Sequence, residues 1–188
     1  ATFNVPNFGE GYCTDDNARL LILCCTLDDT GTAATAGVVA QLETTCLAFL
    51  ADAMDTKDGR CRNFMSHGRQ WLETVGSEDS HGRTLWALGY GAHRCRNSGR
   101  RKFCVRLFAK GLGVAAGFSS PRAWAFALLG INEYLQQEPG EGNAIAMRGL
   151  LMEKLVSLWQ ATATEEWPWF EPAVTYENAR LCQSLLLG

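Results

Sequence analysis

The stretch that decides the fold is residues 14–25, which reads TDDNARLLILCC. Its threonine is suited to cap the N-terminus of a helix, and Asp15 and Asp16 then lie in the first turn, where the helix dipole favours negative charge. The following residues, Leu20 to Cys25, are apolar on every side, which is typical of a helix that is buried all round. The stretch therefore predicts an internal helix with an acidic start.

This helix start is repeated along the chain. Residues 175–181 read TYENARL and match TDDNARL, residues 14–20, at five of seven positions. A looser copy, SEDSHGR, spans residues 77–83, and residues 120–124, SPRAW, keep only the arginine. The four starts, at positions 14, 77, 120 and 175, are 63, 43 and 55 residues apart. A spacing of about 40–60 residues is typical of repeated helical hairpins.

Amphipathic patterns lie between the repeated starts, so buried and half-exposed helices alternate, which indicates an α/α toroid with an inner and an outer ring. The sequence therefore predicts an all-α fold of about seven helices, a partial toroid of helical hairpins in one domain, residues 1–188. A short β-hairpin or loop insertion is expected near residues 58–75. The expected helices begin at residue 14 and then span residues 34–54, 78–94, 100–118, 121–137 and 143–161, with a last one from residue 175 and a loop at residues 28–32.

In a toroid the N-termini of the inner helices face one end, so side chains at the repeated starts converge on a shared cleft. Five acidic residues are expected at its mouth: Asp15, Asp16, Glu78, Asp79 and Glu177. Four arginines are expected one turn below: Arg19, Arg83, Arg122 and Arg180. This cleft is the candidate site.

The repeated starts belong to a larger set of motifs. They are GYCTDDNAR (residues 11–19), RNFM (62–65), GSEDSHGR (76–83), WFEP (169–172) and TYENAR (175–180). As a set, from about residue 9 to the end of the chain, they resemble the six-hairpin, glycosidase-like (α/α)6 domains of bacteria, which are associated with glycosyltransferases. The resemblance implies a toroid that handles carbohydrate, and it assigns no catalytic pair.

The chain departs from this group in length. Six hairpins need twelve helices, and the sequence predicts about seven, so an inner helix would be left with an exposed apolar edge. We expect a second copy of the chain, as a homo-oligomer, or a missing complementary segment to cover that edge.

Glycoside hydrolysis uses two carboxyl groups, about 5 Å apart in retaining enzymes and about 6.5–9.5 Å apart in inverting ones. We expect Asp16 to act with Asp79 or Glu78, and Asp15 and Glu177 are the further catalytic candidates. The alternative is purely structural, because acids in a first turn with an arginine three to five residues later also serve capping and ion pairing.

Substrate contacts are expected from aromatic and polar residues of the cleft. Trp71, Trp167 and Trp169 lie in expected loops, where a flat aromatic face suits the apolar face of a sugar ring, although loop packing is the alternative. His81, close to Glu78 and Asp79, is expected to hydrogen-bond substrate hydroxyls or to take a capping role. The remaining expected contacts are Tyr12, Arg19, Arg83, Glu171 and Arg180.

Three functions are compatible with these patterns. The first is a glycoside hydrolase-like domain that acts on a glycan through acids at the inner-helix starts. The alternative is a non-catalytic carbohydrate-binding or scaffolding domain that serves a glycosyltransferase. The third is a protein-interaction module that uses the open toroid edge.

Composition excludes other classes. The net charge of −3 gives no global attraction to nucleic acid, and the basic cluster of residues 94–106 lacks interleaved aromatic residues. No uninterrupted apolar run approaches the roughly 20 residues that span a bilayer. The eight cysteines form no CxxC pair and indicate small buried side chains in a reducing compartment. We therefore expect a cytoplasmic protein with no cofactor, metal, nucleic-acid or membrane partner.

Overall fold

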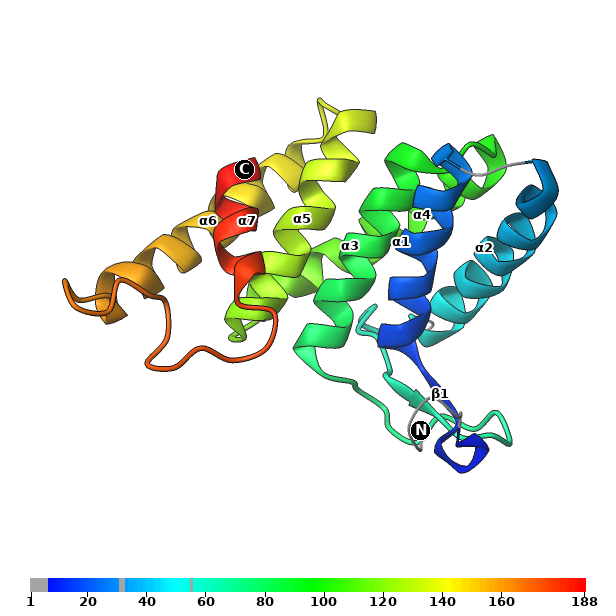
Figure 1. The fold of residues 1–188 in the computed structure, drawn as a ribbon, viewed down its shortest axis with the longest axis horizontal. Helices are drawn as coiled ribbons and strands as arrows, with labels where there is room; N and C mark the ends of the chain where they lie inside the picture. Colours follow the sequence, from blue (N-terminus) through cyan, green and yellow to red (C-terminus); the bar gives the residue numbers. More distant parts are fainter. Residues whose placement is uncertain (1–6, 31–32, 55) are drawn as a thin grey trace.

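The computed structural model describes the chain except for residues 1–6, 31–32 and 55, and this described part is predominantly helical (Figure 1). Its α-helices are α1 (Thr14–Thr30), α2 (Ala33–Ala53), α3 (Glu78–Arg94), α4 (Ser98–Leu112), α5 (Pro121–Gln137), α6 (Gly142–Thr162) and α7 (Ala179–Leu187). Two 3-10 turns, η1 (Phe8–Glu10) and η2 (Gly113–Gly117), and two short strands, β1 (Tyr12–Cys13) and β2 (Phe64–Met65), accompany them. The expected all-α fold is confirmed.

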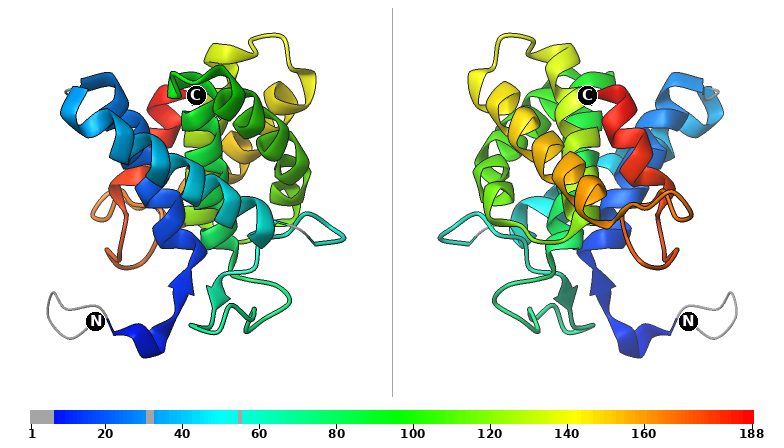
Figure 2. Two further views of the ribbon diagram at one scale, coloured as in Figure 1. Left: turned by 90° about the vertical axis from the view of Figure 1, so that its right-hand side faces the viewer. Right: turned by 90° about the vertical axis from the view of Figure 1, so that its left-hand side faces the viewer.

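The helices form two rows (Figures 1 and 2). In the inner row α1, α3, α5 and α7 each pack against the next, and in the outer row α2, α4 and α6 pack against α1, α3 and α5 in turn. Burial follows this division, since α3 and α5 each bury eleven of 17 residues whereas α6 buries three of 21. The inner helices all begin at the same end of the fold, the lower end in Figure 1.

The close approach of α3 and α5 depends on small residues. A Cβ atom at Gly89 would overlap the backbone of Gly130, and one at Gly130 would overlap the backbone of Leu85. Leu88 and Phe126 are fully buried on the same two helices. The centre of the inner row is therefore held by direct backbone contact and by the apolar core around it.

Residues 56–76, between α2 and α3, contain the expected short hairpin. An antiparallel bridge joins Met65 and Trp71, and Arg69 takes the left-handed conformation, with φ 61°, in the turn between them. β2 also pairs in antiparallel orientation with β1, which comes directly before α1. The sequence did not predict this second pairing, which ties the insertion to the start of the first inner helix.

The starts of α3 and α5 agree with the expectation, and the start of α7 does not. α3 and α5 begin after Ser77 and Ser120, whose side chains accept backbone N–H groups of the first turn. The expected start at Thr175 is wrong, since α7 begins at Ala179. The reason is Glu177, whose φ of 54° places it in the left-handed region, where a right-handed helix cannot continue.

The fourth expected helix is divided. Asn97 accepts N–H groups of Gly99 and Arg100, so α4 begins at Ser98, and it gives way to η2 at Gly113. The expected loop at residues 28–32 is wrong for residues 28–30, which belong to α1, and residues 31–32 lie outside the described residues.

One stretch, residues 36–53 of α2, is long and apolar enough to cross a membrane by length and composition, and 33% of it is buried in the fold. It packs against α1, and its Glu43 is fully buried in an ion pair with Arg100. The stretch therefore meets the test by length and composition only.

Candidate functional site

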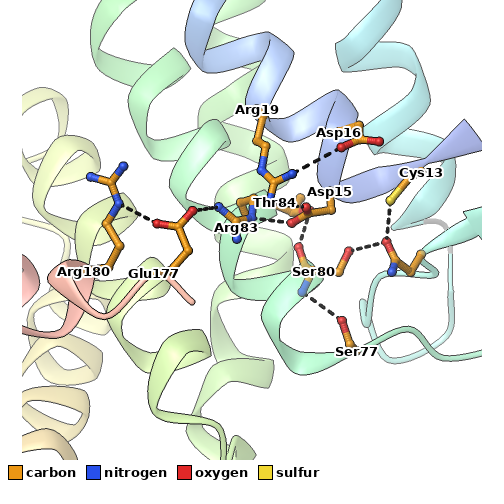
Figure 3. A network of polar contacts seen from close by, with 11 residues as sticks. Cys13, Asp15, Asp16, Arg19, Ser77, Ser80, Arg83, Thr84, Glu177 and Arg180 are labelled. Carbon is orange, nitrogen blue, oxygen red and sulfur yellow. Dashed lines mark hydrogen bonds and ion pairs between the residues drawn. The ribbon is translucent and has the colours of Figure 1, made fainter. Parts of the chain in front are cut away.

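A network of charged side chains joins three segments at the shared start of the inner helices (Figure 3). Arg83 lies at its centre with a side chain only 3% exposed, contacts Asp15 through Nε, and donates from Nη1 to Oε1 of Glu177 at 3.1 Å. Arg180 Nε lies 3.1 Å from Oε2 of Glu177, and Arg19 Nη2 lies 3.0 Å from Oδ2 of Asp15. We call the following six residues the charged network: Asp15, Asp16, Arg19, Arg83, Glu177 and Arg180.

The charged network is electrically balanced, because three carboxylates face three guanidinium groups. Burial raises the pKa of Glu177, but hydrogen bonds from Arg83 and Arg180 outweigh burial and hold the pKa below its ordinary value. Glu177 is therefore ionised at neutral pH. Asp16 differs from the other acids, since its side chain is 72% exposed and contacts Arg19 at 3.4 Å.

Two aromatic rings pack against the arginines of the charged network. The Arg83 guanidinium lies 4.1 Å from the ring centroid of Phe126, and the Arg180 guanidinium lies 4.7 Å from that of Trp86. The rings of Trp86 and Phe126 are parallel within 6°, with centroids 6.1 Å apart. Guanidinium groups stack favourably on aromatic faces, so the two arginines are held in fixed orientations.

The fourth arginine of the helix starts, Arg122, does not join the charged network and instead clamps the segment before α7. Its Nη1 and Nη2 donate to both carboxylate oxygens of Glu171, at 2.9 and 2.7 Å, and its Nε donates to the carbonyl of Tyr176 at 2.7 Å. The hydrogen bonds with Glu171 raise the pKa of Arg122. Tyr176, which the sequence analysis did not select, is exposed beside this clamp.

Glu78 and Asp79 both contact the start of α5. Glu78 Oε2 accepts the N–H groups of Ser119 and Ser120 at 2.8 and 2.7 Å, and Asp79 Oδ1 accepts the Ser120 hydroxyl at 2.5 Å. Burial raises the pKa of Glu78, but these backbone hydrogen bonds outweigh burial and lower it. The two acids therefore join the start of α3 to the start of α5.

Asn63 is a second residue whose role the sequence analysis missed. Its side-chain oxygen accepts the Ser80 hydroxyl at 2.9 Å and lies 3.4 Å from the Cys13 sulfur, while its carbonyl accepts the N–H of Thr14 at 2.8 Å. Asn63 thus connects the insertion to the starts of α1 and α3. The motif RNFM contained it without indicating this role.

Trp71 lines a groove of about 930 Å³. Its indole Nε1 donates to Asp52 at 3.0 Å, and the Arg62 guanidinium lies 4.5 Å from its ring centroid. Tyr12 is 41% exposed and packs on Phe49, whose ring contacts that of Trp71. The groove is lined by Thr56, Lys57, Asp58, Arg62, Trp71, Leu72, Glu73, Thr74 and Val75. We call it the Trp71 groove.

The other two loop tryptophans lie apart from this groove. Trp167 is exposed, and its Nε1 donates to the carbonyl of Glu171 at 2.7 Å, so it belongs to the clamped segment. Trp169 packs against the core and makes an edge contact with Phe170. The structure therefore does not bring the three expected tryptophans to one place.

The expected contact between His81 and substrate is wrong, because His81 is fully buried in the core. Its Nδ1 accepts the N–H of Cys61 at 3.1 Å, and its Nε2 lies 3.0 Å from the carbonyl of Gly111. This pairing assigns a neutral imidazole with the proton on Nε2. Burial lowers the pKa of His81 to about 4.

No protein-family model, curated protein or solved structure matches this chain significantly.

Proposed function

We propose that the chain is a non-catalytic carbohydrate-binding domain that holds a neutral glycan in the Trp71 groove. The observation that carries this proposal is a concave surface with an indole held on its wall by Asp52. The part of the Trp71 indole that Arg62 leaves uncovered offers apolar surface to a sugar ring, and the polar side chains around it offer partners for hydroxyl groups.

The charges of the groove favour a neutral ligand. Lys57 and Arg62 balance Asp58 and Glu73 among the lining residues. Carboxylates accept and cationic groups donate hydrogen bonds, so this lining suits a ligand that both donates and accepts. Phosphate or nucleic acid would need an excess of positive charge.

Binding is favoured over hydrolysis by the ionisation of Glu78 and Glu177, two of the five candidate catalytic acids. A general acid must remain protonated near neutral pH, which requires a raised pKa. Hydrogen bonds outweigh burial at Glu78 and Glu177 and lower their pKa values, and the backbone N–H of Arg60 lowers that of Asp58. The charged network then acts as a scaffold that fixes the start of α1, which Thr14 joins to the groove loop through the carbonyl of Arg62 at 2.7 Å.

Hydrolysis by Asp16 with Asp79 is the second candidate, and the exposure of Asp16 favours it. Under either function, the resemblance of the motifs supports a role beside a glycosyltransferase, with the acceptor glycan in the groove. All eight cysteines lie in the described part and none of them forms a disulfide bond, which supports a cytoplasmic location.

We also propose that a second copy of the chain or a complementary segment covers the open ends of the inner row. Leu23 on α1 is 51% exposed, and Leu186 on α7 is 86% exposed. An apolar groove of about 310 Å³ next to α7 is lined by Val156, Trp159, Pro168, Trp169, Phe170, Cys182, Leu185 and Leu186. Exposed apolar surface of this kind is typical of an interface.

A thermal-shift screen against mono- and oligosaccharides tests the function. A ligand that binds only the folded state raises the melting temperature, and one sugar class should do so reproducibly. Trp71→Ala should remove that shift, whereas Trp159→Ala, which removes an exposed indole outside the groove, should keep it. A shift that survives Trp71→Ala, or no shift with any sugar, would overturn the proposal.

A further inference from the structure

A cluster of buried metal-binding side chains lies away from the groove, between α1, α2 and the end of α3. Cys25, Glu43 and Cys95 are all buried, and their ligand atoms lie within 4.8 Å of one another. The two sulfur atoms are 3.3 Å apart, and the Cys95 sulfur lies 4.0 Å from Glu43 Oε1. Residues 25, 43 and 95 are too widely spaced for a sequence motif to reveal them.

The distances suit a tetrahedral zinc ion. Zinc–sulfur bonds of about 2.3 Å place two sulfur ligands about 3.8 Å apart, so the observed thiols need to separate by only about half an ångström. Thiolates combined with a carboxylate are donors that zinc accepts. Three protein ligands leave the fourth coordination position of the zinc ion to a water molecule, as in zinc sites with three protein ligands generally.

The charges around the cluster also suit a divalent cation. Arg100 Nε lies 2.7 Å from Glu43 Oε2, so the buried Glu43 carboxylate has a guanidinium group beside it. When zinc binds, the two thiols release two protons and become thiolates. The two thiolates and Glu43 then carry three negative charges, which Zn²⁺ and Arg100 balance.

Neighbouring residues are arranged to leave room for the sulfur atoms. The Cys104 thiol hydrogen-bonds to Cys95 from α4, as an outer partner that orients a ligand does. A Cβ atom at Gly91 would lie 2.7 Å from the Cys104 sulfur and 3.5 Å from the Cys95 sulfur. Glycine at this position therefore keeps the space in which the thiols meet.

We propose that Cys25, Glu43 and Cys95 bind one zinc ion, which joins α1, α2 and the end of α3. The site is distinct from the Trp71 groove, and its role is to hold α1 and the end of α3 against the middle of α2. Because the ligands come from three elements, metal binding is coupled to their packing.

The first test uses the full chain, kept reduced with a phosphine and freed of metal by a chelator. Titration with Co²⁺ should produce cobalt–thiolate charge-transfer absorption that saturates at one ion per chain and disappears when Zn²⁺ is added. Absence of thiolate absorption, or absorption that does not saturate at one ion, would overturn the proposal.

The second test measures Zn²⁺ affinity by competition with a chromophoric chelator. Cys25→Ser and Cys95→Ser should each weaken Zn²⁺ binding by at least about a hundredfold. Removal of a residue that only hydrogen-bonds to a metal ligand weakens binding by up to about a hundredfold, so loss of a ligand should cost at least as much. Cys61→Ser, the same substitution at a buried cysteine outside the cluster, should leave affinity unchanged. If either cluster variant fails to fold, Glu43→Gln, which keeps the shape, should still weaken binding at least about tenfold. Equal affinity in the cluster variants and the control would contradict the site.

Discussion

Arg83 and Glu177 are 94 residues apart in the chain, and their side chains meet at 3.1 Å. Each belongs to a copy of the repeated helix start, on α3 and just before α7. Asp15, from the first copy, contacts the same guanidinium group. The repeat in the sequence is therefore also a contact in space, and a buried arginine joins three of its copies.

Removing Arg83 should destabilise the fold strongly. Arg83→Ala would leave Asp15 and Glu177 without their shared partner, and breaking a buried ion pair by removing one member costs about 3–5 kcal/mol. Chemical denaturation at neutral pH should show this loss in the free energy of unfolding. Arg19→Ala is the control, because the Arg19 side chain is 51% exposed and such pairs contribute at most about 1 kcal/mol. Equal losses in the two variants would refute the central role of Arg83.

The close contact of α3 and α5 predicts opposite effects for two glycine substitutions. Gly130→Ala should destabilise the protein by about 1–3 kcal/mol, since its Cβ would overlap the backbone of Leu85. Gly149→Ala, on α6 with no atom nearby, should stabilise it by about 0.5–1 kcal/mol through reduced backbone entropy. Thermal melts of both variants measure the difference, and a neutral Gly130→Ala would disprove the contact.

His81 should make the fold sensitive to acid. Its pKa falls from 6.5 to about 4 on burial, so the unfolded chain binds the proton more strongly across that window. The contribution of His81 to stability is therefore complete above pH 6.5 and is lost as the pH falls towards 4, by about 3 kcal/mol in all.

Imidazole titration followed by NMR tests this directly. The His81 resonance should titrate near pH 4. A His81 midpoint at or above pH 6 would show that the ring is not buried as described.

The clamp predicts a local change in dynamics. Lysine cannot reproduce the two-pronged contact of Arg122 with Glu171, so Arg122→Lys should loosen the segment before α7. Amide hydrogen exchange in residues 171–178 should accelerate several-fold, with no change in α1. Uniform acceleration in both regions would instead indicate general destabilisation.

The helix pattern was predictable where caps and apolar residues agree. α3 and α5 have the bounds expected from the sequence, because Ser77 and Ser120 mark their starts. The start of α7 was not predictable, since nothing in TYENARL indicates the left-handed φ of Glu177. A local motif can thus be repeated while its backbone conformation differs.

The candidate site was predictable in part. The repeat correctly predicted that Asp15, Arg83 and Glu177 lie close together, because the equivalent starts of parallel helices lie at the same end of the fold. The prediction for His81 was wrong because it relied on the short distance in sequence from Glu78. On the helix the His81 side chain turns towards α4 and is buried there. The thiol cluster was missed because its ligands lie on separate elements and only the fold brings them together.

One NMR measurement tests the central claim, that this domain binds a glycan without cleaving it. A glycan from the sugar class found by thermal shift is mixed with the protein, and saturation-transfer difference spectra are followed over hours. Glycan binding without cleavage predicts saturation transfer to the sugar ring, loss of this transfer in Trp71→Ala, and no new anomeric signals. New anomeric signals that vanish in Asp16→Asn would show hydrolysis and contradict binding without cleavage. Absence of saturation transfer would show that the groove binds no glycan and would contradict it as well.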